Sequence, residues 1–165
     1  MHRNRGFTLV ELMVTLAILA IMLAIAAPSF HDAIRNNRTQ ATANDLLTAL
    51  QYARSEAIKR GEKIDVCRRN GNSCANATNW SAGWLVKISG ASGEVLRVWH
   101  ALDGQSRVTG PNETMTYRPN GLLLKPLNAP DIQFVIDTPN CSGKPLYRIS
   151  LSATGRATSI KGTCP

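Results

Sequence analysis

The sequence is poor in charged residues, and the shortage is concentrated near its N-terminus. Asp, Glu, Lys and Arg make up 18% of the chain, compared with about a quarter in average soluble domains. Between Phe7 and Phe30 the only charged residue is Glu11. Hydrophobic residues amount to 44%, which excludes a fully disordered protein. A length of 165 residues suits one domain with an appendage better than a large two-domain enzyme.

The sequence also lacks the common signatures of catalysis. It contains neither a P-loop nor a glycine-rich dinucleotide turn. His100, Asp103 and Ser106 lie close together in sequence, but a nucleophilic triad is defined by geometry, and ordinary polar residues at a strand end explain these three better. The histidines His2, His31 and His100 form no zinc motif with the cysteines. We therefore expect no catalytic residue, metal or cofactor, and a protein that is not an enzyme.

The apolar stretch at residues 7–30 is long enough to cross a membrane. As a helix it would span about 36 Å, which exceeds the hydrocarbon core of about 30 Å. Arg3 and Arg5 precede it, so the positive-inside tendency places the N-terminus in the cytoplasm and the remainder outside. We expect residues 7–29 to form a single-pass transmembrane helix and residues 30–165 to form an extracytoplasmic head.

A cleavable secretory signal is the alternative, because Ala24-Ile25-Ala26 offers a cleavage site. Glu11 argues against it, since a carboxylate costs roughly 2.5 kcal/mol or more near the bilayer centre and a discarded segment has no need of one. If the chain were cut after Gly6, Phe7 would carry a free α-amine about one helical turn from Glu11. The amine of a neighbouring subunit would neutralise Glu11, in a pair worth roughly 4 kcal/mol at about 4 Å.

The N-terminal segment resembles the processing site of type IV prepilins and type II secretion pseudopilins, on the residues Gly6-Phe7-Thr8-Leu9-Val10-Glu11-Leu12. This resemblance implies that prepilin peptidase removes residues 1–6 as a leader, that Phe7 is N-methylated and that Glu11 acts in subunit registry. It also implies a precursor in the bacterial inner membrane, with a periplasmic head, that then joins other major and minor pilins in an extracellular pilus. Pro28 falls where many pilins carry a helix-kinking proline.

Helical periodicity continues beyond Pro28. Apolar residues recur at mostly three- and four-residue steps as far as Ile58. Lys59 and Arg60 then place cations in a last turn before Gly61, a typical helix stop. We predict one helix from about Thr8 to Arg60, apolar all round in its first half. Its second half is amphipathic and must pack on other elements.

The remaining sequence alternates between strand-like segments and turns. The segments with strand character are 63–67, 83–88, 94–99, 115–117, 121–124, 131–136, 147–152 and 156–160. Residues 70–81, which are rich in Asn and Ser, are predicted to be a loop. Closely spaced strands favour an antiparallel sheet with the helix over one face, and hence an α+β fold. Trp80, Trp84 and Trp99 are expected to anchor the core or loops.

The head resembles the GspH/FimT group of pseudopilins and minor pilins. The residues that carry this resemblance are Gln51–Ala57, Gly83-Trp84 and Gly155-Arg156. The resemblance covers the whole chain and implies a FimT- or FimU-like minor pilin that helps to prime or cap the pilus. A GspH-like minor pseudopilin of a type II secretion system is the alternative.

Four cysteines lie in the head, and an even number in an extracytoplasmic domain indicates disulfides. Of the three possible connectivities we favour Cys67–Cys74, which closes a tight loop, together with Cys141–Cys164. The second pair would meet across a hairpin that turns near residues 153–154. Such a bond stabilises the fold by roughly 3 kcal/mol. A zinc site is the rival interpretation.

The head is basic. Two of the 19 Lys and Arg residues and one of the 11 Asp and Glu residues precede Pro28, which leaves 17 basic and 10 acidic residues and a net charge of +7 beyond it. Strand alternation places Arg148 on the solvent side. Candidate DNA-binding residues are Arg68, Arg69, Arg148, Arg156 and Lys161, although a solvated surface accounts for such charges equally well.

Basic side chains bind DNA phosphates without reading sequence. Some FimT members bind DNA for natural transformation through a Gly-Arg-x-Arg motif near the C-terminus. The similar segment here is Gly155-Arg156-Ala157-Thr158, which matches the first arginine but has Thr158 in place of the second. Extracellular double-stranded DNA is therefore a candidate partner.

Overall fold

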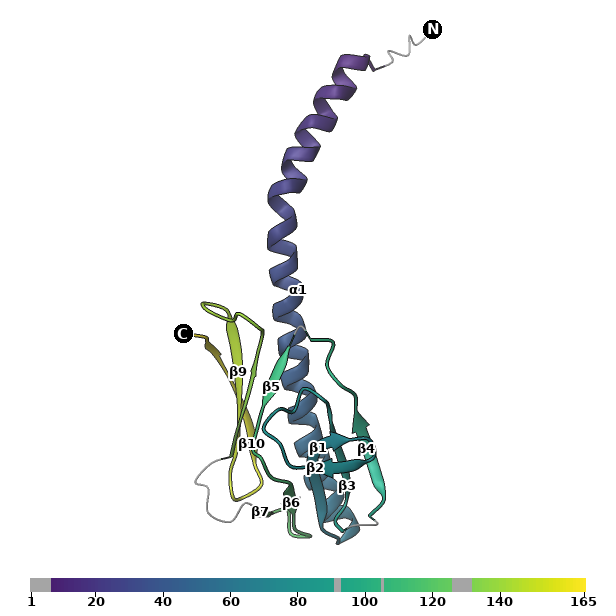
Figure 1. Cartoon of the computed structure of the whole chain (residues 1–165), viewed down its shortest axis with the longest axis vertical. Helices are drawn as coiled ribbons and strands as arrows, with labels where there is room; N and C mark the ends of the chain where they lie inside the picture. The colour runs from purple at the N-terminus through teal and green to yellow at the C-terminus, as the bar shows by residue number, and fades with distance from the viewer. Residues whose placement is uncertain (1–6, 91–92, 105, 126–131) are drawn as a thin grey trace. The chain divides into compact units, whose positions relative to one another are not determined.

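The protein is one long helix followed by a β-rich head (Figure 1). The computed structural model describes residues 7–90, 93–104, 106–125 and 132–165, without the side chains of residues 25–29 and 31 within the helix. The leader and Gly6, and the candidate strand residue Asp131, lie outside the described residues. The chain divides into two compact units, with the boundary between Ile34 and Arg35.

Helix α1 extends over Leu9–Arg60, as the periodicity predicted, and Pro28 does not end it. The side-chain oxygen of Thr8 accepts a hydrogen bond from the Glu11 backbone N–H at 3.2 Å, so Thr8 caps the first turn. At the other end the Gly61 N–H donates to the Ala57 carbonyl at 3.1 Å. The helix boundaries thus follow from local capping chemistry.

Within the described part of the chain, no helix combines the length and apolarity that crossing a membrane requires.

The described residues after α1 contain ten strands, all paired antiparallel. They are β1 (Ile64–Asn70), β2 (Ser73–Ala75), β3 (Trp84–Ile88), β4 (Val95–Trp99), β5 (Arg107–Thr109), β6 (Met115–Tyr117), β7 (Leu123–Lys125), β8 (Ile132–Asp137), β9 (Pro145–Leu151) and β10 (Ala157–Thr163).

These strands form two sheets, a division that the strand pattern did not reveal. One sheet has the order β4-β3-β1-β6-β7, with β2 also paired to β1, and the other has the order β10-β9-β8-β5. Residues 73–75, which we predicted to be part of a loop, form β2 because the chain reverses tightly and pairs Asn70 with Ser73. Strand β5 was missed because Val108 is the one apolar residue among its three, so the segment shows no apolar alternation.

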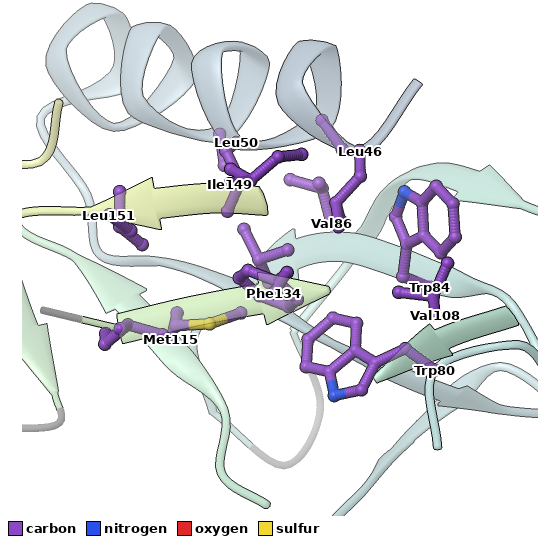
Figure 2. Packing of buried hydrophobic residues seen from close by; sticks show 14 of the residues in the cluster. Leu46, Leu50, Trp80, Trp84, Val86, Val108, Met115, Phe134, Ile149 and Leu151 are labelled. Carbon is purple, nitrogen blue, oxygen red and sulfur yellow. The ribbon is translucent and has the colours of Figure 1, made fainter. Parts of the chain in front are cut away.

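Both sheets pack against the C-terminal half of α1 and share one core. Figure 2 shows Leu46 and Leu50 of α1 pointing toward Val86 of one sheet and Ile149 of the other, and all four are fully buried. Burying each such side chain contributes about 1.5–3 kcal/mol. The α+β fold with the helix packed on antiparallel sheet is therefore confirmed.

The three tryptophans contribute ring contacts to the sheets and loops of the head. Trp80 meets Phe134 edge to face, with ring centroids 5.0 Å apart, and Trp84 stacks on Trp99 at 6.4 Å. Trp80 and Trp84 are buried and Trp99 is half-buried. Their surface burial and ring contacts explain their presence as core anchors.

Candidate functional site

The N-terminal turn of α1 presents an exposed carboxylate beside the expected processing site. Phe7 is 82% exposed, and the Thr8 cap holds the backbone of Glu11 one turn further on. None of the ion pairs among the described residues involves Glu11. The Glu11 carboxylate is thus available to a cation outside this chain.

The side chains around Glu11 form an exposed apolar surface. Large apolar residues between positions 9 and 23 are exposed by 50–74%. They are Leu9, Val10, Leu12, Met13, Val14, Leu16, Ile18, Leu19, Ile21, Met22 and Leu23. A continuous apolar surface of this kind marks an interaction with a membrane or with other proteins.

Two disulfides tie down the head. They join Cys67 to Cys74 and Cys141 to Cys164, with Cα–Cα distances of 5.4 and 5.7 Å, so they are the pairs that the spacing favoured. The first bridges the β1–β2 hairpin. The second closes the end of the β9–β10 hairpin, where the Cys164 N–H donates to the Lys144 carbonyl at 2.9 Å. All four sulfurs are used, which leaves no thiolate for zinc.

The candidate arginines of β1 hold neighbouring loops. The Arg68 Nε donates to the Asn79 carbonyl at 2.9 Å, and the Arg69 Nε donates to the Gly71 carbonyl at 2.7 Å. A further guanidinium nitrogen of Arg69 lies 3.2 Å from His100 Nδ1. Both arginines therefore have structural partners within the six-stranded sheet and its loops.

Arg148 and Arg156 lie on the other sheet. Arg148 is exposed between buried neighbours on β9, as strand alternation predicted, and it pairs across the sheet with Val135 and Ile160. Arg156 is exposed just before β10, and alternation along that strand places it on the same face as Ile160. The two arginines therefore share the outer face of the four-stranded sheet.

Lys161 does not join this face. It pairs with the buried Tyr147, so alternation places it on the opposite face from Arg148 although its side chain is exposed. The five candidate DNA-binding residues are thus distributed over two sheets, and of these the structure groups Arg148 with Arg156.

An ion pair that the sequence did not reveal lies on the same outer face. The Arg107 guanidinium donates two hydrogen bonds to the Asp137 carboxylate, at 3.0 and 2.8 Å, across the β5–β8 pairing. The hydrogen bond to Asp137 raises the pKa of Arg107. Because β5 escaped prediction, this pairing escaped it too. Asp137 is neutralised locally and does not offset the charge of Arg148.

The Gly155-Arg156 motif has a packing explanation. Gly155 has φ +76°, and a Cβ there would lie 2.2 Å from the carbonyl oxygen of Gly121. The Arg54 Nε of α1 donates to this same oxygen at 3.2 Å. Two segments of the family resemblance, in the helix and near the C-terminus, thus meet at Gly121 and fix the turn that carries Arg156.

The three residues considered as a nucleophilic triad have three different partners. His100 lies against Arg69, Asp103 forms an ion pair with Arg38, and the Ser106 hydroxyl lies 3.4 Å from the hydroxyl of Thr39. These contacts hold separate loops against the helix and β1.

Two family models match this chain, one at its N-terminal segment and one over most of the remaining residues. The family model "Prokaryotic N-terminal methylation motif" matches residues 1–27, and the model "Type II transport protein GspH" matches residues 42–155. The crystal structure of the type IV minor pilin FimU from Pseudomonas aeruginosa superposes with a TM-score of 0.58 and 25% identity, over 73% of this chain and 91% of that one.

Curated relatives include a prepilin peptidase-dependent protein and a fimbrial protein. "Prepilin peptidase-dependent protein D" of Escherichia coli K12 is 31% identical over 120 residues, which cover 70% of this chain and 74% of that protein. A "Fimbrial protein" of Pseudomonas aeruginosa is 43% identical over 65 residues, and the match spans 41% of its length. The chain therefore belongs to the GspH family and is a type IV minor pilin or pseudopilin-like protein with an N-terminal methylation motif.

Proposed function

We propose that this protein is a minor subunit of a type IV pilus that enters the filament through α1 and helps to prime or cap it. The observation that carries the proposal is the exposed apolar surface of the helix, with Glu11 beside the processing site. Prepilin peptidase cuts the chain after Gly6 and so removes residues 1–6, and Phe7 becomes the methylated N-terminus.

The chemistry of Glu11 explains how assembly selects one register. Residues 7–29 hold the precursor in the inner membrane, with the head in the periplasm. Removing the leader creates an amine at Phe7, and the amine of one subunit meets the carboxylate of another. Such a pair is worth roughly 4 kcal/mol at about 4 Å, so neighbours that bring the two charges together are favoured over other registers.

The head is built for an extracytoplasmic environment. Disulfides form and persist in oxidising compartments, and the Cys141–Cys164 bond closes the C-terminal strand. A terminus tied in this way resists fraying outside the cell.

Two measurements test the assignment. Mass spectrometry of the mature protein should find N-methylated Phe7 as its first residue, and the chain should be present in filaments sheared from cells. A mature protein that begins near Pro28, or one found only as a free secreted monomer, would contradict the proposal.

A minor pseudopilin of a type II secretion system is the second candidate function, supported by the description of the GspH family model. The relatives named as fimbrial proteins and the FimU structure favour the pilus. Deleting the gene separates the two: loss of pili with normal exoprotein secretion supports the pilus role, and the reverse supports the secretion role.

We further propose that Arg148 and Arg156 bind the phosphates of extracellular double-stranded DNA for uptake. Both are exposed on one face, and none of the ion pairs among the described residues involves them. The nearby Asp137 carboxylate is already paired with Arg107. Two phosphate contacts release counterions, so binding should weaken with added salt.

A mobility-shift assay with the full-length chain in detergent tests this role. The double variant Arg148→Ala plus Arg156→Ala should reduce the slope of log affinity against log salt by about 1.8, the value for two phosphates. Lys161→Ala removes the same type of charge from the opposite face and is the matched control. A change of about 0.9 in the slope with Lys161→Ala, the value for one phosphate, would reject the assignment to the outer face.

A further inference from the structure

Most sheet edges in the described residues are short, irregular or covered. Strands β2 and β7 have three residues each, and the pairing of β4 shifts register next to Val86. The free side of β5 is covered, because the Trp80 N–H donates to the Val108 carbonyl and the Gly110 N–H donates to the Thr78 carbonyl, both at 2.9 Å. These are the devices by which proteins prevent strand addition.

Strand β10 is longer and regular, and no described strand covers its free side, although it carries one charged residue, Lys161. Its seven residues pair with β9 without a register shift, and no other described strand pairs with it (Figure 1). Residues 158–161 are exposed on both faces of the strand. β10 is therefore a long, regular edge whose outer backbone groups face solvent.

The register shows which backbone groups are available. The Ser152 N–H donates to the Arg156 carbonyl at 3.0 Å, and the Cys164 N–H donates to the Lys144 carbonyl at 2.9 Å. Antiparallel pairs alternate between bonded and non-bonded positions, so the even-numbered residues of β10 bond to β9. The N–H and C=O groups of Ala157, Ser159, Lys161 and Thr163 point to the open side.

Both ends of this edge are held in place. Gly155 packs against Gly121 just before β10, and Cys164 is bonded to Cys141 just after it. A binding strand that is already fixed loses little conformational entropy when a partner pairs with it. The strand also contains β-branched Thr158, Ile160 and Thr163 and no proline, which favours extended pairing.

The charge near β10 favours an acidic partner. Lys161 lies within the strand, Arg156 precedes it, and Arg148 lies beside Ile160 on β9. Because the chain beyond Pro28 carries a net +7, pairing with a second copy brings like charges together. A strand that carries carboxylates meets complementary charge at the same edge.

We propose that an extended acidic segment of a neighbouring pilin-type subunit pairs with β10 and adds a fifth strand to the four-stranded sheet. Backbone hydrogen bonds supply the affinity of such strand addition, and side chains supply its selectivity. The inference rests on the proposed function and names a contact through which the head meets its neighbours.

Synthetic peptides of the same length as β10 test the edge directly. One alternates valine with glutamate and the other alternates valine with lysine. With the full-length chain in detergent, the glutamate peptide should slow hydrogen exchange of the Ser159 and Lys161 amides about tenfold or more. The lysine peptide should leave them unchanged. Equal protection by both peptides, or by neither, would overturn the proposal.

Variants separate edge pairing from folding. Ser159→Pro removes an outward N–H without removing a bond to β9, so it should abolish protection by the glutamate peptide. Ser159→Val keeps this N–H, so the glutamate peptide should still protect the strand. Lys161→Glu should reduce the protection given by the glutamate peptide and increase the protection given by the lysine peptide. This variant keeps the test informative even if the proline variant misfolds. An unchanged preference in Lys161→Glu would reject the acidic partner.

Sheared filaments distinguish this inference from the proposed function. If the wild-type chain is absent from filaments, the pilus assignment itself fails, and with it the contact. If wild type and Ser159→Val are present but Ser159→Pro is reduced about tenfold, the edge contact is supported. Equal amounts of all three would reject the edge contact and leave the pilus assignment intact. Dimers of this chain held through β10 would also count against an acidic neighbour.

Discussion

Both halves of α1 carry large apolar side chains, but the two halves differ in what covers those side chains. Near the N-terminus Leu16 and Leu19 are exposed by 56% and 52%, whereas Leu46 and Leu50 are fully buried. The two sheets cover the second pair within the head. The difference follows the sequence pattern, because an amphipathic half packs within its own domain, whereas a half that is apolar all round is left for another molecule.

The acidic residues of the two ends differ in the same way. Glu56 is buried and paired within the helix, with its carboxylate 2.6 Å from the Arg60 Nε. Glu11 is exposed and takes part in none of the ion pairs among the described residues. One carboxylate serves the fold, and we assign the other to assembly.

The largest expected effect is on filament entry. Glu11→Ala should leave processing after Gly6 intact but reduce the amount of the chain in sheared filaments at least about tenfold, because the amine of a neighbour loses its partner. Quantitative immunoblotting of filament and membrane fractions measures this. Glu113→Ala, at an exposed position in the head, is the control. If Glu11→Ala entered filaments normally, Glu11 would have no role in assembly that distinguishes it from Glu56.

Core truncation at matched leucines is the next test. Leu50→Ala should lower the free energy of unfolding of the head by about 2–5 kcal/mol, since it leaves a cavity in the shared core. Leu16→Ala, on the exposed surface, should change it by less than about 0.5 kcal/mol. Chemical denaturation of the full-length chain in detergent measures both. Comparable losses would mean that the N-terminal half is also packed within the subunit.

The smallest expected effect is a pH dependence at Glu56. The hydrogen bond from Arg60, with a further contribution from Lys59, lowers the pKa of Glu56 below its ordinary value. A lowered folded-state pKa adds stability above the unfolded-state pKa, and this stability is lost as the pH falls through the folded value. The decrease in unfolding free energy on acidification should therefore be smaller in Glu56→Gln. If the free energy of unfolding fell equally with pH in the wild type and in Glu56→Gln, the ionised Glu56 would not contribute to stability.

Local patterns were sufficient for the helix and most strands. The start of α1 follows from Thr8, whose side chain caps the first turn, and its end follows from the cations before Gly61. The spacing of Cys141 and Cys164 across one hairpin indicated their bond. Each of these depends on residues close in sequence or related by a single turn.

The positions of the basic residues could not be obtained in this way. Arg148 was placed correctly on the solvent side because strand alternation is local. Lys161 was grouped with it, although the register of β10 on β9 places the two on opposite faces. A shift of one residue in the pairing moves every side chain of a strand to the other face. The position of Lys161 relative to Arg148 therefore depends on the register between β9 and β10, which the sequence did not predict.

Sequence patterns were enough to identify an apolar helix with one acid near its start, an amphipathic continuation, a set of short strands and an even number of cysteines. Each is a local property of composition, spacing or capping. Tertiary structure alone decided the division into two sheets, the pairing of Arg107 with Asp137 and the exposure of β10. These depend on which distant strands meet, and strand partners are selected by packing of the whole core rather than by any one segment.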